Sequence, residues 1–164
     1  MGSPTKEMYW DNFLSLTRKA KVYQKSEWLL IEQKDVSFNP ADGYITKGIP
    51  KQNSEKHFIQ TNELETYSPS FKVNLGKPTS KIVVSWKAFA QNKILELRFV
   101  LTTIEENPQS KVIYLKDFMV LNSNTQMEYL IEFDFPITSF EAYFWNGNTK
   151  EIVDYSDFRI ESYK

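Results

Sequence analysis

Residues 126–136 read QMEYLIEFDFP, and this stretch decides the fold class because apolar and polar side chains alternate at every second position. Alternation with a period of two places one row of side chains on each face of an extended strand. We predict a strand that ends at Pro136, with one face in a core and the other in water. The row predicted to enter the core comprises Met127, Tyr129, Ile131, Phe133 and Phe135.

The same period recurs in neighbouring segments, which are separated by turn signals rich in Gly, Asn and Pro. Strands are predicted near residues 67–75, 82–89, 95–102, 112–120, 140–145 and 157–163. Turns or loops are expected at residues 76–78, 91–93, 105–110 and 146–148. Two apolar rows stand out, one formed by Ile82, Val84, Trp86 and Ala88 and the other by Tyr67, Pro69, Phe71, Val73 and Leu75.

The N-terminal third of the chain has weaker patterns. Residues 28–31 form a compact apolar run that predicts a strand, and residues 38–44 and 48–53 read as long loops. Residues 6–24 fit a helical apolar stripe and an irregular segment equally well.

These patterns predict an all-β fold, an antiparallel two-sheet β-sandwich, in a single domain that spans residues 1–164. Residues 1–53 supply an N-terminal strand and long loops, and residues 54–164 form the core of the sandwich. A chain of this length buries enough surface for one core without disulfides or a structural metal.

Composition excludes several classes of function. The chain has no cysteine and one histidine, His57, which removes thiolate metal sites, redox chemistry and multi-histidine metal sites. Its net charge of −1 predicts no binding to nucleic acid. No apolar run is long enough to span a membrane, and the N-terminus lacks the apolar segment of a secretory signal. The start Met-Gly-Ser-Pro fits two alternatives equally well, a native N-terminus without a signal and a vector remnant in place of a signal or an upstream domain.

Two pairs of motifs carry a resemblance to a known family. SEKHFIQ (54–60) followed by ETYSPSF (65–71) resembles the early strands of galactose-binding-like and carbohydrate-binding-module jelly rolls. AYFWN (142–146) followed by VDYSDFRIE (153–161) is similar to the closing hairpin of the same domains. The chain departs from the family pattern at Glu55, where a glycine is usual, and at residues 155–156, which interrupt an acidic pair.

The resemblance implies a jelly-roll core and a non-catalytic module that binds a glycan weakly in the cell envelope or the secreted space of a bacterium. It therefore implies an extracytoplasmic location, whether periplasmic, cell-surface or secreted. The alternative is a structural or assembly domain that contacts a partner protein within a larger envelope protein.

A sugar site needs aromatic faces that stack on pyranose rings and polar side chains that bond to hydroxyls. The residue types that suit this role and are predicted to bind ligand are Tyr114, Tyr143, Trp86, Lys87, Arg98 and Asn146. Tyr114 and Tyr143 are expected to be the exposed aromatic members, since Lys116 and Glu141 lie in their rows. Burial in the core is the alternative for every aromatic side chain, and it is the expectation for Trp145.

The resemblance also implies a structural calcium ion between an acidic residue near the N-terminus and acids of the last strand. Calcium binds six to eight oxygens, so such a site would bring together Asp11, Asp154 and Asp157. The alternative is that these acids cap turns or face water, because no dense acidic loop is present.

The carboxylates do not form a pattern that favours catalysis. Glu128, Glu132 and Asp134 alternate along the solvent face of one predicted strand, which explains them without an active site. His57 lies beside Phe58 and has no assured nucleophile partner. We therefore expect no enzyme activity.

Overall fold

The computed structural model describes residues 28–92, 96–115, 123–147 and 151–164. The alternatives for residues 6–24 and the predicted calcium ligand Asp11 lie outside these residues. The described strands are β1 (Leu30–Val36), β2 (Ile45–Lys47), β3 (Lys51–Gln52), β4 (His57–Thr61), β5 (Ser70–Ala90), β6 (Leu97–Thr103), β7 (Ser110–Tyr114), β8 (Ser123–Asn146) and β9 (Val153–Tyr163). A short 3-10 helix, η3 (Pro40–Asp42), lies between β1 and β2.

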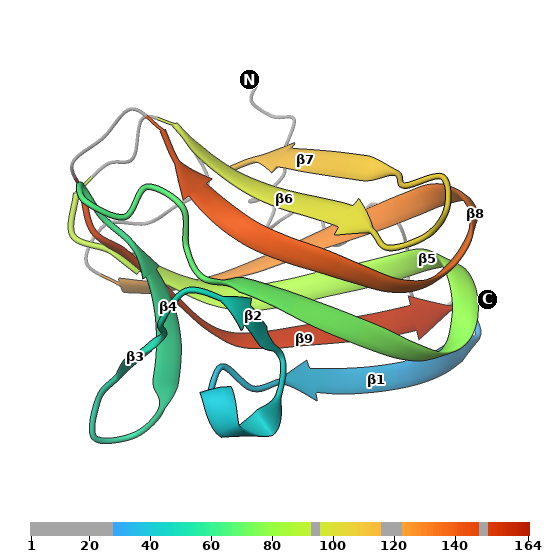
Figure 1. Cartoon of the computed structure of the whole chain (residues 1–164), viewed down its shortest axis with the longest axis horizontal. Coiled ribbons are helices and arrows are strands. Elements are labelled where there is room, and N and C mark those ends of the chain that lie inside the picture. Colours follow the sequence, from blue (N-terminus) through green and yellow to red (C-terminus); the bar gives the residue numbers. More distant parts are fainter. Residues whose placement is uncertain (1–27, 93–95, 116–122, 148–150) are drawn as a thin grey trace.

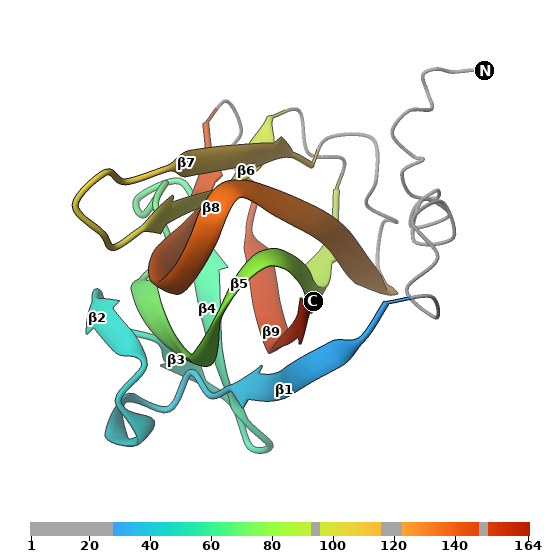
Figure 2. The ribbon, with the colours of Figure 1, turned by 90° about the vertical axis from the view of Figure 1, so that its right-hand side faces the viewer.

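The strands form two antiparallel layers, which confirms the predicted all-β sandwich (Figures 1 and 2). In the first sheet, β9 lies between the C-terminal part of β5 on one side and both β1 and β4 on the other; the N-terminal part of β8 completes it. In the second sheet, β2, the N-terminal part of β5, the C-terminal part of β8, β6 and β7 follow one another. The small β3 strand pairs only with β4.

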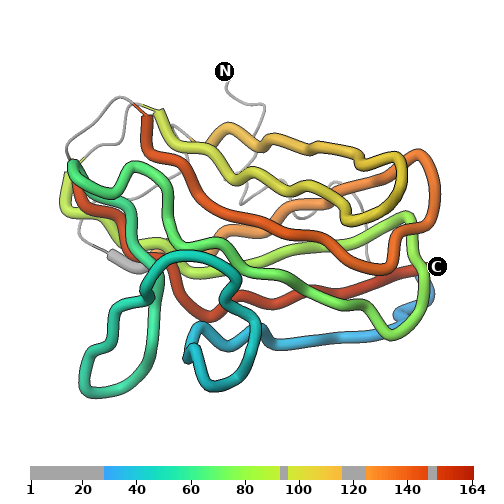
Figure 3. Tube along the Cα trace, in the orientation of Figure 1, coloured from blue at the N-terminus to red at the C-terminus, as the bar shows by residue number. Residues whose placement is uncertain are grey.

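Two long strands, β5 and β8, belong to both layers and pair with each other along most of their length (Figure 3). The sequence predicted a turn at residues 76–78 and a strand that ends at Pro136. Both segments lie within the continuous strands β5 and β8, so the predicted strand ends are wrong, whereas the change of direction predicted at residues 76–78 is present as the bend of β5 (Figure 3). The register instead shifts between Asn74 and Thr79, and the two strands bend together from one sheet into the other.

This bend also corrects the prediction for Phe135, which was assigned to the core row. Phe135 is 54% exposed, because the strict alternation is lost where β8 turns from the first sheet to the second. Met127, Ile131 and Phe133, which precede the bend, are buried as predicted.

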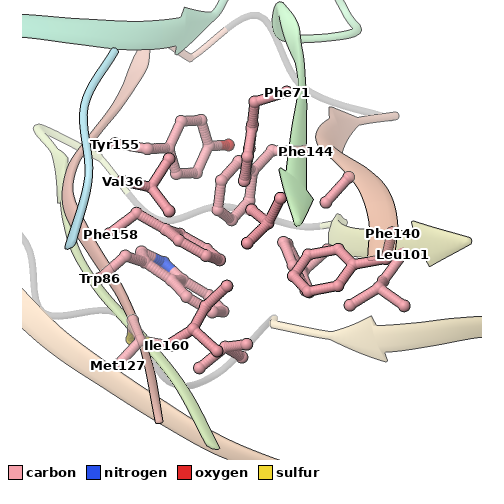
Figure 4. Close-up of a cluster of buried hydrophobic side chains, with 14 of the residues drawn as sticks. Val36, Phe71, Trp86, Leu101, Met127, Phe140, Phe144, Tyr155, Phe158 and Ile160 are labelled. Atoms are coloured by element: carbon pink, nitrogen blue, oxygen red, sulfur yellow. The ribbon is translucent and has the colours of Figure 1, made fainter. Parts of the chain in front are cut away.

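The core lies between the two sheets and is rich in aromatic rings (Figure 4). Trp86 is fully buried and stacks on Phe158 with ring centroids 5.9 Å apart and an interplanar angle of 8°. Phe99 and Phe144 of the second sheet approach the same indole, each at 5.1 Å. Trp86, which belongs to the apolar row predicted for residues 82–88, thus contacts aromatic rings of both sheets.

A second contact in the core combines stacking with a hydrogen bond. The rings of Tyr155 and Phe144 lie 3.9 Å apart and are nearly parallel, and the Tyr155 hydroxyl is 3.0 Å from the hydroxyl of Thr61. Both Tyr155 and Thr61 are fully buried. Burial raises the pKa of Tyr155 far above its ordinary value of 10.0, since the phenolate would lose its hydration.

Among the described residues, none forms a helix with the length and apolarity that a bilayer crossing requires.

Candidate functional site

The outer face of the second sheet carries a group of large side chains in direct cross-strand register. Tyr67 bridges to Trp145 on β8, Trp145 pairs with Arg98 on β6, and Arg98 pairs with Tyr114 on β7. Tyr143, two residues before Trp145, shares its face of β8. We call these five residues, Tyr67, Arg98, Tyr114, Tyr143 and Trp145, the aromatic platform.

The side chains of the aromatic platform contact one another. The Tyr67 ring lies 5.7 Å from the ring of Tyr143 and 6.4 Å from that of Trp145. The Arg98 guanidinium lies over Trp145 at 4.4 Å and over Tyr114 at 4.8 Å. The guanidinium therefore fills the space between two aromatic rings and makes the row continuous.

Two further contacts fix the geometry of the platform. Glu96, which precedes β6, forms an ion pair with Arg98 through a hydrogen bond donated by the guanidinium. The indole of Trp145 lies against Gly147, where a Cβ would overlap the ring. The backbone of Gly147 thus leaves room for Trp145 to lie flat at the end of β8.

The exposure and the length of the platform decide what it can contact. Tyr67 is 60% and Tyr114 is 57% exposed, whereas Tyr143 and Trp145 are half-buried and present part of each ring. Four positions in register across neighbouring strands span about 14 Å, since strands lie about 4.8 Å apart. A row of aromatic rings of this length with one cation and one carboxylate can stack on sugar rings and bond to hydroxyls.

Three of the residues predicted from the sequence to bind ligand therefore lie together, namely Tyr114, Tyr143 and Arg98. Two others are corrected by the structure. Trp86 and Asn146 are fully buried, so neither side chain can face a ligand. Asn146 instead closes the loop after β8, where its amide nitrogen donates to the backbone carbonyl of Glu151 at 2.9 Å.

Trp145 was predicted to be buried, and this prediction is also wrong. The alternation that places Phe144 in the core places Trp145 on the outer face. The sequence analysis did not identify Tyr67 or Glu96 as site residues. Glu96 could have been found, because it is two residues from Arg98 and thus on the same face of the chain. Tyr67 precedes β5 and was placed in the same apolar row as Phe71, so no signal in the sequence separated the two residues.

Lys87 and Asp157 lie on the other side of the molecule, on the outer face of the first sheet. The Asp157 carboxylate is 3.0 Å from Lys56 Nζ and 3.7 Å from Lys87 Nζ. Asp154 accepts a hydrogen bond of 2.8 Å from the amide of Gln60. In the described part of the chain, no three His, Asp or Glu side chains are placed to hold a metal ion. The calcium site of Asp11, Asp154 and Asp157 stays a prediction.

Comparison with known proteins gives similarity of structure only. No protein-family model matches the sequence, and no protein with curated annotation matches it. Several of the solved structures that resemble the chain are carbohydrate-binding modules, the group that the sequence motifs resemble.

Three of these structures illustrate the extent of the similarity. The xylan-binding module CBM15 has a TM-score of 0.49 at 6% identity, over 82% of this chain and 95% of its own. The C-terminal CBM6 of LamC, a marine laminarinase from Zobellia galactanivorans, has a TM-score of 0.47 at 11% identity, over 79% and 98%. The CBM22-1 xylan-binding domain of Xyn10C from Paenibacillus barcinonensis has a TM-score of 0.46 at 14% identity, over 84% and 86%. The assignment of this chain as a two-sheet sandwich rests on its own strand pairing.

Proposed function

We propose that the chain is a non-catalytic module that binds a glycan through the aromatic platform. The observation that carries this proposal is the row of aromatic rings, exposed at Tyr67 and Tyr114, that is held in register around Arg98 on the second sheet. Tyr143 and Trp145 would stack on the apolar faces of sugar rings, and Arg98 and Glu96 would bond to hydroxyl groups.

The shape of the platform favours weak and reversible binding. It is an open sheet face, so a bound sugar would keep one side in water and bury less surface than in an enclosed pocket. The strand register and the contacts of Arg98 and Gly147 hold the rings in place before binding, which lowers the entropy cost of ordering them. Useful affinity would then come from several modules on one polymer.

An extracytoplasmic location, in the cell envelope or the secreted space, belongs to the same proposal. Its support is the likeness of residues 54–71 and 142–161 to jelly-roll modules of envelope proteins. The alternative function is that of a domain that docks on a partner protein. The following test distinguishes this alternative from glycan binding.

Affinity gel electrophoresis against soluble polysaccharides tests the proposal. We expect at least one neutral polysaccharide to retard the protein, and we expect Tyr143→Ala and Tyr114→Ala to migrate without retardation. Phe135→Ala is the matched control, since Phe135 is a similarly exposed aromatic outside the platform. Absence of retardation by every polysaccharide, or equal retardation of all variants, would contradict glycan binding at the platform.

A further inference from the structure

The second sheet ends at β7, and within the described part of the chain this strand pairs with β6 on one side only. Figure 1 shows β7 beside β6 at the top of the sheet. The free side of such a strand presents a row of unpaired N–H and C=O groups, which is a template for another strand. What can pair there depends on which backbone groups face outward and on the side chains that flank them.

The register of β6 and β7 fixes the outward-facing groups. Leu115 donates its N–H to the carbonyl of Leu97 at 2.8 Å, just after β7. At the other end, the carbonyl of Gln109 accepts from Thr103 at 2.9 Å. Because the bonding of an antiparallel ladder alternates along each strand, the odd-numbered residues of β7 bond to β6 and the even-numbered ones point their N–H and C=O groups away from it. The outward-facing residues of β7 are therefore Ser110, Val112 and Tyr114.

The outer strands elsewhere in the described sheets carry charged side chains, which discourage pairing with another chain. On β1, the Glu32 carboxylate accepts a 2.8 Å hydrogen bond from the backbone of Gly76. Lys34 of the same strand donates through Nζ to the carbonyl of Asn74 at 2.5 Å. Both contacts tie β1 to the bend of β5. Charged residues on the remaining outer strands include Lys47 of β2, Lys51 of β3 and Glu128 in the N-terminal part of β8.

β7 lacks these protective features on its exposed face. Ser110, Val112 and Tyr114 are uncharged, and Val112 is 44% and Tyr114 57% exposed. The charged residue of the strand, Lys111, lies on the opposite face, with Nζ over the ring of Phe133 at 5.9 Å. The strand contains no proline, and its pairing with β6 is regular. Its outer edge is therefore open to a strand of matching length.

The outward-facing residues of β7 are complementary to themselves. An antiparallel second copy of β7, placed with Val112 opposite Val112, also brings Ser110 opposite Tyr114 on both sides. All three outward residues then form pairs that exchange both backbone hydrogen bonds. A shift of two residues toward the start of the strand would place Pro108 opposite Tyr114, and proline has no N–H to donate. The geometry thus favours one register, with a two-fold axis at Val112.

The side chains fit the same register. Directly opposite residues have Cβ atoms about 5 Å apart, so the two Val112 side chains would contact each other and bury their apolar surface. The small Ser110 would lie beside Tyr114 and leave room for its ring. Lys111 would lie opposite Ile113, so the pairing brings no like charges together. The net charge of −1 on each copy adds little repulsion.

We propose that β7 is an interface between two copies of this chain, which pair edge to edge about a two-fold axis at Val112. The inference goes beyond the proposed function, because self-association needs no glycan. Three residue pairs make a small interface, so the dimer is weak and depends on concentration. The axis is perpendicular to the sheet, so the outer faces of both copies lie on one side, and Ser110 of the second copy extends the aromatic platform beyond Tyr114. The dimer would thus present two platforms to one polymer.

Sedimentation equilibrium of the full chain, from micromolar to millimolar concentration, tests the interface. We expect the average mass to rise from the monomer mass of 19.3 kDa toward twice that value. Val112→Glu and Val112→Lys each place like charges across the axis at an exposed position, and both variants should stay monomeric. Ile152→Glu is the matched control, since Ile152 is an exposed apolar residue outside β7, and it should associate like the parent chain.

An equimolar mixture of the two charged variants checks the register. Association should return in the mixture, because Glu and Lys then lie opposite each other at the axis. A constant monomer mass of the parent chain, association of Val112→Glu and Val112→Lys on their own, or a mixture that stays monomeric would overturn the proposal.

Amide hydrogen exchange locates the interface independently. At millimolar concentration the amides of Ser110, Val112 and Tyr114 should exchange more slowly than at micromolar concentration, whereas that of Ile113, which faces β6, should change little. Protection of other strands in place of these three amides would contradict an interface at β7. Trp145→Ala should dimerise like the parent chain, so loss of self-association and loss of glycan binding are separate results.

Discussion

Replacing Tyr155 by phenylalanine isolates one hydroxyl group in the core. The ring would keep its stacking on Phe144, while the hydroxyl of Thr61 would lose its 3.0 Å partner in a fully buried site. A hydrogen bond contributes about 1 kcal/mol, and an unsatisfied buried partner raises the cost to about 1–3 kcal/mol. We therefore expect Tyr155→Phe to lower the free energy of unfolding by about 2 kcal/mol, which is roughly 4–8 °C in Tm.

Urea unfolding followed by tryptophan fluorescence measures this change. Thr61→Val should cost a similar amount, because it leaves the Tyr155 hydroxyl unpaired. The double variant should cost much less than the sum of the two, since replacing both partners by apolar groups is nearly neutral. Full stability of Tyr155→Phe, or strict additivity in the double variant, would refute the inferred hydrogen bond.

Three more predictions follow from the same structure. Because burial raises the pKa of Tyr155, the unfolded chain loses the phenolic proton at a lower pH than the folded chain does. The free energy of unfolding should therefore fall above pH 10, by up to about 1.4 kcal/mol per pH unit, and should fall less steeply in Tyr155→Phe. Equal slopes for the two chains in alkaline urea titrations would contradict this. Gly48→Ala should lower the Tm more than Gly43→Ala does. Both glycines have positive φ, but only at position 48 would an added Cβ meet another atom, the Cα of Pro69 at 2.9 Å. A larger decrease in Tm for Gly43→Ala would argue against the inferred clash. The predicted calcium site implies a higher unfolding midpoint in calcium than in chelator, and identical midpoints would remove it.

The sequence predicted the layers of the fold well, because burial of one strand face leaves a period of two. The row of Ile82, Val84, Trp86 and Ala88 is buried as its alternation predicted. What alternation could not predict is the path of β5 and β8 through both sheets. That path depends on a register shift between strands distant in the sequence, and the local turn signals at residues 76–78 marked the bend without showing that strand pairing continues on both sides of it.

The site was predicted in part, because its residues are brought together by pairing between strands that are distant in the sequence. The side-chain chemistry of Arg98, Tyr114 and Tyr143 identified them as candidates for sugar binding, but the sequence did not show that they are neighbours. Trp86 was misassigned because an aromatic side chain suits a sugar and a core equally well. Its apolar row already favoured the core, just as the row of Glu141 and Tyr143 already favoured the outer face of the sheet for Trp145.

Calorimetric titration with the oligosaccharide that matches the retarding polysaccharide tests the platform most directly. The account predicts that Trp145→Ala, folded as judged by its spectrum, binds at least about tenfold more weakly than the parent chain, a loss of about 1.4 kcal/mol. Phe135→Ala should bind like the parent chain. Unchanged affinity in Trp145→Ala would contradict the platform as the glycan-binding surface.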